Sequence, residues 1–280
     1  MRISILGSNG QLGQDLGAAL DSHDLRRFTR NDFDVTDFER ARVLLAEARP
    51  EIIINLTAYH RVDDCEAFPD LAYRVNASAV LNLARIANDL NAKLVQFSTD
   101  YVFDGNSSTP YDESSVPFPL SVYANSRLAG EYLVRSHARH HILIRTCGLY
   151  GHAGSQGKGG NFVEAMLKKA RNNEPIQVVN DQIVTPTSTK DLARQVAVLV
   201  SGPDEGLFHA TNEGACSWYE FATAIFDISG LRANLAPTTS ELYKTPARRP
   251  RYSVLENRRL KDLGVNCMLP WRDALAEYLG

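Results

Sequence analysis

The chain has 280 residues, of which 44% are hydrophobic and 22% charged, and its formal net charge is −3. This balance is typical of a globular protein, and a chain of this length buries about three quarters of its unfolded surface without a disulfide or metal. Collagen-like, coiled-coil and disordered chains are excluded. The lack of a basic excess also predicts that nucleic acid is not a partner.

Three features of the sequence predict a cytoplasmic protein without a membrane partner. The richest apolar run, Val196–Val200, is far shorter than the roughly 18 residues of a membrane helix. Met1–Gly13 lacks the charged start, apolar core and small-residue cleavage site of a signal peptide. Four scattered cysteines without a C-x-x-C pair predict free thiols in a reducing compartment.

Short apolar runs alternate with helical patterns in the first half of the chain. The runs that predict buried parallel strands are Ile3–Leu6, Leu25–Phe28, Ile52–Leu56, Leu94–Phe97 and Ile142–Ile144. The helical patterns between them are Gln11–Leu20, Asp37–Ala48 (with a capping box at Thr36 and Glu39), Leu71–Leu90 and Tyr123–Arg135. This alternation predicts an α/β fold with a doubly wound parallel sheet of the Rossmann type.

Elements become shorter after Tyr150. The expected strands are Ile176–Val179 and Leu207–Ala210, and the expected helices are Phe162–Arg171, Asp191–Val200, Trp218–Ile228, Arg258–Leu263 and Trp271–Leu279. Loops are expected over His152–Asn161 and Pro237–Pro250. We expect a Rossmann domain over residues 1–150, to which segments of 176–211 return, and a smaller C-terminal domain over residues 151–280.

The first strand leads into a glycine-rich loop that opens a helix, Gly7-Ser8-Asn9-Gly10-Gln11-Leu12-Gly13. Glycines allow a tight turn and close approach to a pyrophosphate, and the N–H groups at a helix start attract phosphates. The loop therefore predicts dinucleotide binding. The residues expected to contact the dinucleotide are Gly7, Asn9, Gly10, Gln11 and Leu12.

The end of the second strand distinguishes NADP from NAD. An acidic residue there would bind the ribose hydroxyl of NAD, but this chain has Arg30, which suits a 2′-phosphate. A solvated surface arginine is the alternative interpretation. Asp34 either contacts the adenine end or simply precedes the helix cap. We expect NADPH as cofactor of domain 1–150, with NADH as the alternative, and substrate binding by domain 151–280.

A hydroxyl, a phenol and a cation are expected at the catalytic centre. Leu94–Phe97 is expected to end beside the first strand, which places Thr99 near the nicotinamide. Tyr123 and Arg127 are four residues apart in a helical pattern and therefore share one face. The cation is expected to favour the phenolate and lower the pKa of Tyr123 toward its working range. These three groups predict a carbonyl reductase.

Several motifs make the chain resemble the extended short-chain dehydrogenase/reductases, and within them the dTDP-4-dehydrorhamnose reductases. The motifs are Gly7-x-x-Gly10-x-x-Gly13, Ser98-Thr99-Asp100-Tyr101-Val102-Phe103-Asp104-Gly105, Tyr123 with Leu128-Ala129-Gly130-Glu131, Arg145-Thr146, Gly160-Asn161-Phe162, Asn180-Asp181-Gln182 with Pro186-Thr187, and Arg249-Pro250. The resemblance implies reduction of the 4-keto group of a dTDP-linked 6-deoxy sugar in nucleotide-sugar biosynthesis. It implies that Thr99 hydrogen-bonds the keto oxygen and Tyr123 protonates it. Thr57, Ala58 and Tyr59 are expected to contact the cofactor, as are Tyr123 and Arg127.

Two positions depart from the family pattern. The family pair is Tyr-x-x-x-Lys, whereas this chain has Arg127, which keeps the charge but cannot release a proton. An alternative function is therefore a non-catalytic regulatory protein of the same fold that binds a dinucleotide or sugar nucleotide. Gly148 stands where the family often has a tryptophan against the sugar, although a strand-end turn would also explain a glycine.

All but one of the expected substrate residues are charged or polar. Arg249, from the group Arg248, Arg249 and Arg251, is expected to bind the substrate diphosphate, and solvated charge is the alternative. The other expected substrate residues are Val62, Asp63, Asp100, Tyr101, Lys158 and Asn161, of which Asn161 alternatively holds the backbone.

Other chemistries find no support in the sequence. His60, Asp63, Cys65 and Glu66 fit no zinc spacing, and no G-x-S-x-G nucleophile elbow is present. We expect no metal and a protein that is a monomer or a homodimer.

Overall fold

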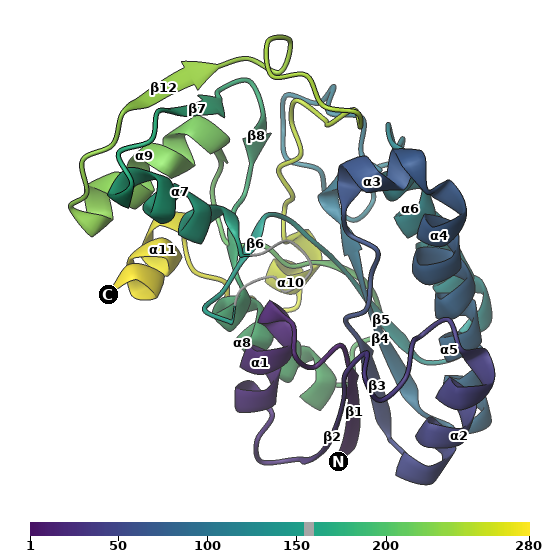
Figure 1. The fold of residues 1–280 in the computed structure, drawn as a ribbon. Coiled ribbons are helices and arrows are strands. Elements are labelled where there is room, and N and C mark those ends of the chain that lie inside the picture. Colours follow the sequence, from purple (N-terminus) through teal and green to yellow (C-terminus); the bar gives the residue numbers. More distant parts are fainter. Residues whose placement is uncertain (154–159) are drawn as a thin grey trace.

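A six-stranded parallel sheet forms the centre of the computed structural model, which describes residues 1–153 and 160–280 (Figure 1). Its strands are β1 (Arg2–Leu6), β2 (Asp24–Phe28), β3 (Ile52–Asn55), β4 (Lys93–Thr99), β5 (His141–Thr146) and β10 (Gly206–His209). They are arranged in the order β10-β5-β4-β3-β1-β2, and each neighbouring pair is parallel. The predicted doubly wound α/β fold is confirmed.

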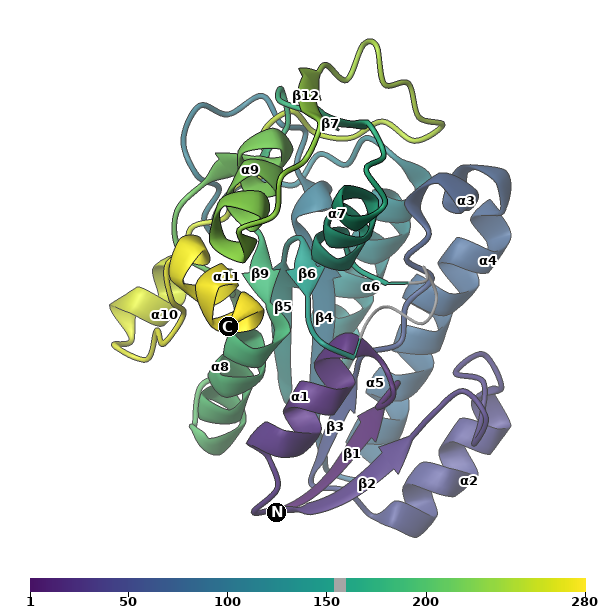
Figure 2. The same cartoon turned by 60° about the vertical axis from the view of Figure 1, so that its left-hand side comes forward.

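Helices cover both faces of this sheet because alternate strand residues point to opposite faces. Ile3 and Ile5 pack with α1 (Gln11–Ala19) and α8 (Thr189–Ser201). Leu6 and Ile53 pack in a second core on the other face. The helices of that face are α2 (Phe38–Ala48), α5 (Ala79–Asp89) and α6 (Val122–His137), and Figure 2 shows α1 and α8 on the near side of the sheet.

The expected position of the fourth strand was wrong. Register pairs join Ile3 to Ile52 and Ile52 to Lys93, so β3 lies between β1 and β4. The chain passes from β1 outward to β2 and then returns to β3 on the other side of β1. The reversal of strand order therefore falls between β1 and β3, and β4 ends one strand further along.

Two helix predictions also need correction. Asp37, rather than Thr36, caps α2, because its carboxylate accepts the amide of Arg40 at 3.0 Å. The single helix expected over Leu71–Leu90 is instead α4 (Pro69–Tyr73), a π-helical turn (Arg74–Ser78) and α5. Periodicity cannot show such a turn, because one extra residue hardly disturbs an apolar pattern. Helix α3 (Val62–Ala67) was not predicted.

The second half of the chain builds a smaller layer beyond the end of the sheet that lies away from the N-terminus (Figures 1 and 2). Its main elements are α7 (Phe162–Arg171), β7 (Ile176–Val179), α9 (Trp218–Ser229), β12 (Leu235–Thr238) and α11 (Trp271–Leu279), with α10 (Arg258–Asp262) beside β10. Short ladders join β6 (Leu149–Tyr150) to β9 (Thr187–Ser188) and β8 (Ile183–Val184) to β11 (Cys216–Ser217). Strand β10 returns to the central sheet, whereas β7 pairs with β12 outside it.

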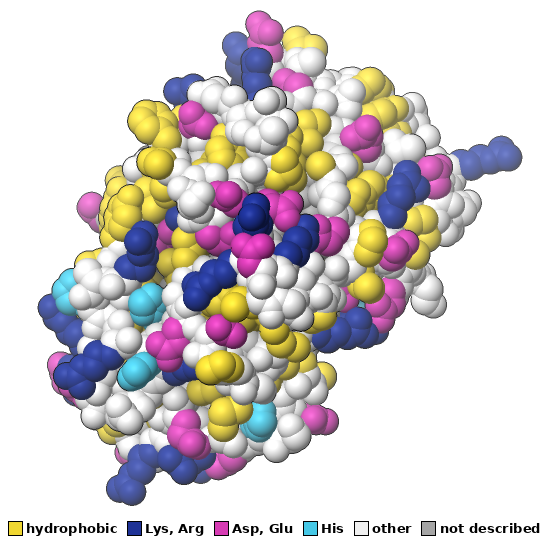
Figure 3. All heavy atoms as spheres, turned by 180° about the vertical axis from the view of Figure 1, so that it is seen from behind, with side chains coloured by type: hydrophobic (Ala, Val, Ile, Leu, Met, Phe, Trp, Pro, Cys, Tyr) yellow, Lys and Arg dark blue, Asp and Glu magenta, His cyan; other side chains and the backbone are white. Residues whose placement is uncertain are grey.

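The surface carries charges of both signs. Figure 3 shows Lys and Arg side chains interspersed with Asp and Glu on the face opposite to that of Figure 1. Within the described residues, no helix combines the length and apolar character needed to cross a bilayer. None of the four cysteines, all of which lie in the described part of the chain, forms a disulfide bond, and three of them are buried.

Candidate active site

The glycine loop lies against the segment that follows β3. Gly7 adopts a left-handed φ of 80°, and a Cβ at this residue would lie 3.5 Å from the backbone of Leu56 and from the side chain of Thr57. A Cβ on Gly13 would lie only 2.6 Å from the carbonyl oxygen of Ser8. The loop therefore requires glycine at Gly13 for close packing of helix on turn, as the sequence predicts.

The other predicted loop residues differ in what their side chains do. The side chain of Leu12 is buried in the core, so only its backbone, in the first turn of α1, can face a phosphate. Gln11 directs its side chain to the protein: its Oε1 accepts the amide of Gly151 at 3.0 Å and Nδ2 of Asn161 at 3.2 Å. Gln11 thus ties the start of α1 to the second half of the chain.

Arg30 lies at the exposed end of β2 and forms an ion pair with Asp34 at 2.9 Å. The side chain of Arg30 is 86% exposed, so a ligand phosphate can reach it. Asp34 also accepts the amide and hydroxyl of Thr36, at 2.9 and 2.7 Å. These hydrogen bonds match the interpretation in which Asp34 organises the approach to α2.

The segment after β3, which contains Thr57, Ala58 and Tyr59, is held by two buried asparagines. Asn55 accepts the amide and hydroxyl of Thr57, at 3.1 and 2.6 Å. Asn76 accepts the amide of Tyr59 at 2.9 Å and donates to its carbonyl oxygen at 3.1 Å. Asn76 belongs to the π-helical turn, a distortion that often marks functional sites.

The same asparagine reaches the helix that carries the predicted catalytic pair. Nδ2 of Asn76 donates to the hydroxyl of Ser126 at 2.9 Å, and that hydroxyl donates to the carbonyl oxygen of Tyr123 at 2.7 Å. Asn76 therefore fixes both the segment after β3 and the first turn of α6. Sequence reasoning missed it because its role depends on a π-helical turn that the apolar pattern does not show.

The structure brings Thr99, Tyr123 and Arg127 together at the carboxyl end of β4. Thr99 ends this strand, and its hydroxyl donates to Oδ1 of Asp100 at 3.0 Å and accepts the amide of Tyr101 at 3.2 Å. Tyr123 is in the first turn of α6, and the Thr99 hydroxyl is near enough to act on the pKa of its phenol. Its ring packs edge-on against Tyr101, with the ring centroids 6.2 Å apart.

Arg127 is buried one turn further along α6, with 6% of its surface exposed. Its Nη2 donates to the carbonyl oxygen of Phe97 in β4. Its Nη1 is also buried and has no hydrogen-bond partner among the described residues. A buried guanidinium nitrogen without a partner is costly, so the site is suited to a polar ligand at this point.

The expectation for the pKa of Tyr123 needs correction. Burial raises this pKa above its ordinary value, and the opposing effects of Arg127 and of the Thr99 hydroxyl do not cancel the rise. Tyr123 is therefore a neutral phenol at physiological pH. That is the protonation state needed to donate a proton to a ketone oxygen during reduction.

Helix α6 is packed closely against the π-helical turn. A Cβ on Gly130 would lie 2.3 Å from the carbonyl oxygen of Asn76. The start of the helix is fixed as well, since Oε1 of Glu66 accepts the amide of Val122 at 2.8 Å. Glu66 and Gly130 therefore restrict both the position and the direction of the helix that carries Tyr123.

A buried ion pair fixes α6 to β5. Glu131 accepts Nε and Nη2 of Arg145 at 2.9 and 2.6 Å, and the two side chains are only 1% and 2% exposed. The ring of His209 lies 3.4 Å from Nη1 of Arg145, and burial, with that positive charge, lowers the pKa of His209 to about 3. The sequence motifs contained Glu131 and Arg145, but their pairing could be seen only in the fold.

Asp100 is buried, and its carboxylate contacts Thr99 and Cys147. It is 3% exposed, and its Oδ2 accepts the Cys147 thiol at 3.1 Å. Burial raises the pKa of Asp100 to about 6, and hydrogen bonds from neighbours such as Cys147 and Thr99 limit the rise. Burial also raises the pKa of Cys147 well above its ordinary value, so this thiol is unreactive.

Two predicted substrate residues form an ion pair with each other. Arg249 donates to Oδ1 and Oδ2 of Asp63 at 3.1 and 2.8 Å, and it also contacts Thr245 and Tyr101. The pair borders a hollow of about 420 Å³, which Val62 also lines. Burial raises the pKa of Tyr101, which leaves this phenol neutral.

The remaining predicted residues lie around the edge of this region. Nδ2 of Asn161 donates to the carbonyl oxygen of Gly151 at 2.9 Å, and Oδ1 accepts the amide of Glu164 at 3.0 Å. These contacts match the backbone-holding alternative for Asn161. Lys158 lies outside the described residues.

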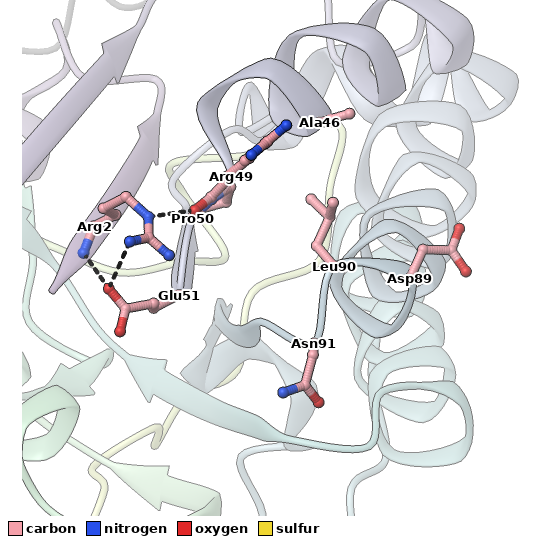
Figure 4. A pocket seen from close by; sticks show the side chains of 8 residues that line it. All are labelled: Arg2, Ala46, Arg49, Pro50, Glu51, Asp89, Leu90 and Asn91. Carbon is pink, nitrogen blue, oxygen red and sulfur yellow. Dashed lines mark hydrogen bonds and ion pairs between the residues drawn. The ribbon is translucent and has the colours of Figure 1, made fainter.

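A second hollow, also of about 420 Å³, lies at the opposite end of the sheet (Figure 4). Arg2 lines this hollow and donates hydrogen bonds through Nε to the carbonyl oxygen of Arg49 and through its backbone amide to Glu51. None of the predicted site residues lines this hollow. In residues 1–153 and 160–280, no group of three His, Cys, Asp or Glu side chains is placed to hold a metal ion.

Several observations show that a dinucleotide fits this site. The glycine turn has no room for side chains at Gly13, the first turn of α1 presents amides, and Nη1 of Arg127 is buried without a partner. Arg30 adds an exposed cation at the end of β2. The glycine turn and Thr99 both lie at the carboxyl ends of the parallel strands, the edge where such folds bind ligands.

Comparisons with known proteins agree with this geometry. The model of the RmlD substrate binding domain family matches residues 1–280. The spore coat polysaccharide biosynthesis protein SpsK of Bacillus subtilis (strain 168) is 39% identical over 280 residues, which cover 99% of this chain and 96% of SpsK. A dTDP-4-dehydrorhamnose reductase structure from Clostridium acetobutylicum has a TM-score of 0.95 and 38% identity, covering 100% of this chain and 98% of that one.

A further solved structure includes a cofactor. The dTDP-4-dehydrorhamnose reductase of Bacillus anthracis, in complex with NADP, has a TM-score of 0.94 and 36% identity, covering 99% of this chain and 98% of that one. The likeness extends over the whole length of both chains. This chain therefore belongs to the RmlD substrate binding domain family, within the extended short-chain dehydrogenase/reductases.

Proposed function

We propose that this protein is an NADPH-dependent reductase of the 4-keto group of a dTDP-linked 6-deoxy sugar, as dTDP-4-dehydrorhamnose reductases are. The observation that supports the proposal most strongly is that Thr99, Tyr123 and Arg127 lie close together at the carboxyl end of β4. Full-length relatives named dTDP-4-dehydrorhamnose reductase support the substrate class.

We assign cofactor binding to residues at the carboxyl ends of β1, β2 and β3. The glycine turn and the first-turn amides suit the pyrophosphate, and Arg30 suits a 2′-phosphate. The Bacillus anthracis relative was crystallised with NADP, which supports NADPH over NADH. When bound, NADPH supplies the hydride that reduces the carbonyl carbon. The domain assignment, with residues 1–150 binding the cofactor and residues 151–280 the substrate, is part of the same proposal.

The chain's own side chains handle the proton and the substrate's orientation. We assign the hydrogen bond to the keto oxygen to the Thr99 hydroxyl, which must then turn its proton away from Asp100, and we assign protonation of that oxygen to the neutral phenol of Tyr123. Arg127 stabilises the phenolate that remains after transfer. Because a guanidinium does not deprotonate, Tyr123 regains its proton from water or from ligand hydroxyls, with Arg127 acting only through its charge and N–H groups.

On the substrate side, Arg249 is proposed to bind the diphosphate. Asp63 holds the guanidinium of Arg249 in place at the border of the hollow. Val62 and Tyr101 are proposed to complete the substrate surface, Asn161 holds the backbone of Gly151 at its edge, and Asp100 supports it from inside the protein. Lys158 remains a proposed contributor from sequence alone.

The alternative, a binding protein without turnover, rests on Arg127. In its favour is the loss of the ionisable lysine. Against it are the hydrogen bond of Arg127 to Phe97 and its partnerless Nη1, which leave the guanidinium poised beside Tyr123 rather than neutralised by a carboxylate.

The test is oxidation of NADPH by the wild-type protein with a panel of keto-sugar nucleotides, followed by identification of the product. Turnover of dTDP-4-keto-6-deoxy-L-mannose to the reduced sugar supports the proposal. Absence of turnover with a reagent that a control enzyme reduces contradicts it. A large gain in activity for Arg127→Lys indicates a decayed catalyst, and good activity in the wild type rejects the binding-only alternative.

The setting of the reaction is part of the proposal. Four cysteines that form no disulfide in the described structure suit the reducing cytoplasm. We propose that the protein works there as a monomer or a homodimer, which light scattering of the purified protein distinguishes.

A further inference from the structure

Gly148 is covered by a tryptophan from another element. Gly148 has a left-handed φ of 53°, and a Cβ on this residue would lie 3.3 Å from Cη2 of Trp218 and 3.3 Å from Cα of Pro186. Such contacts are tighter than ordinary packing, so a side chain here requires movement of the indole. The edge of Trp218 therefore fills the space that a side chain at Gly148 would otherwise enter.

This covered glycine lies close to the catalytic strand ends. Thr146, two residues earlier, is the register partner of Thr99 in the sheet. Cys147, the preceding residue, donates its thiol to Asp100, which follows Thr99. The indole edge is therefore next to the segment that supports Thr99, on the side of the second half of the chain.

Trp218 is held in place by motifs for which the sequence suggested no role. Its amide donates to the carbonyl oxygen of Gln182 at 3.3 Å, and the capping residue Ser217 donates to Asn180 at 2.7 Å. The indole packs on Phe162, with the ring centroids 4.8 Å apart. Trp218 is nevertheless not fully buried, and part of the residue remains accessible.

We propose that the indole of Trp218 is the apolar wall against which the hexose ring of the nucleotide-sugar substrate rests, a specificity role that builds on the proposed function. Ligand sites use rigid aromatic surfaces for the apolar faces of their ligands and leave polar groups for orientation. The indole edge over Gly148 places such a surface next to Thr99, the residue assigned to the keto oxygen. The diphosphate residue Arg249 is a separate contact, so the wall acts on the sugar and not on the nucleotide.

The chain offers a matched control, because it has two tryptophans. Trp271 is also half-buried, and it packs on Phe221 in the same core, with the ring centroids 5.8 Å apart. Trp218→Ala, Trp218→Phe and Trp271→Phe are compared with the wild type, each saturated with NADP⁺. Calorimetry then gives the dissociation constants of dTDP-glucose and of dTDP alone.

Trp218→Ala is expected to weaken the binding of dTDP-glucose about tenfold while changing the affinity for dTDP by less than about twofold. Trp218→Phe is expected to bind dTDP-glucose with an affinity between those of Trp218→Ala and the wild type. Trp271→Phe is expected to bind both ligands with wild-type affinity. Equal weakening of both ligands, or no weakening of dTDP-glucose, overturns the proposal. Circular dichroism of each variant separates loss of binding from loss of folding.

The Trp271→Phe protein supplies a second readout, since Trp218 is then the only tryptophan. Its fluorescence is expected to change on addition of dTDP-glucose and to remain nearly constant with dTDP. An identical response to both ligands contradicts the proposal. If the wild type binds neither ligand, the proposed function itself fails, whereas normal binding with an indifferent Trp218 refutes only this inference.

Discussion

Replacing Glu131 by glutamine is expected to destabilise the protein by about 3–5 kcal/mol, because it leaves a buried guanidinium without its counter-charge. Arg145 is 2% exposed and donates two short hydrogen bonds to Glu131, at 2.9 and 2.6 Å. Neutral His209 and the ring of Phe103 also lie near this guanidinium, and neither can replace the lost charge. The melting temperature is expected to fall by roughly 10 °C, since each kcal/mol shifts it by about 2–4 °C in a protein of this size.

Urea and thermal unfolding followed by circular dichroism measure this loss. Asp262→Asn is the matched control, because it makes the same carboxylate-to-amide change in the exposed pair with Arg258, whose side chains are 60% and 63% exposed. The control is expected to cost about 0.5 kcal/mol or less. If the two variants lose equally little stability, Glu131 does not anchor α6 and the reasoning about this pair is wrong.

Three further predictions follow from single contacts. Gly130→Ala is expected to lower stability by about 1–3 kcal/mol in urea unfolding, because its Cβ would lie 2.3 Å from the carbonyl oxygen of Asn76; an unchanged midpoint contradicts this. Gly13→Ala is expected to weaken NADPH binding at least about tenfold in calorimetry, because its Cβ would lie 2.6 Å from the Ser8 carbonyl oxygen and displace the turn. Wild-type affinity would refute the assignment of this loop to cofactor binding. Burial raises the pKa of Asp100 from 3.8 to about 6, so its ionisation destabilises the fold as pH rises through that interval. The free energy of unfolding of Asp100→Asn, measured relative to the wild type, should therefore rise by up to about 3 kcal/mol between pH 4 and pH 7. A difference in stability between the two proteins that does not change with pH opposes this account.

Most strands and helices along the chain were predictable from the sequence. β-branched runs such as Ile52–Leu56 are buried on both faces of a parallel sheet, and this leaves a clear pattern. Phe162–Arg171 and Trp271–Leu279 were placed with the bounds that the structure shows. Local apolar periodicity is sufficient for such elements.

Relations between distant segments were not predictable in the same way. The position of β3 between β1 and β4 depends on how the chain crosses over, which no local pattern encodes. The role of Asn76 depends on the π-helical turn, and the pairing of Asp63 with Arg249 joins residues far apart in sequence. The raised pKa of Tyr123 likewise reflects burial in the folded site, whereas the sequence showed only the nearby cation.

The most direct test of the central claim is the turnover of Tyr123→Phe with NADPH and dTDP-4-keto-6-deoxy-L-mannose. The variant keeps the ring that packs on Tyr101 and loses only the hydroxyl group that is proposed to protonate the ketone. We expect kcat to fall at least about 100-fold, while the dissociation constants of NADPH and dTDP stay at their wild-type values. Turnover within a few-fold of the wild type would show that another group supplies the proton and would contradict the account.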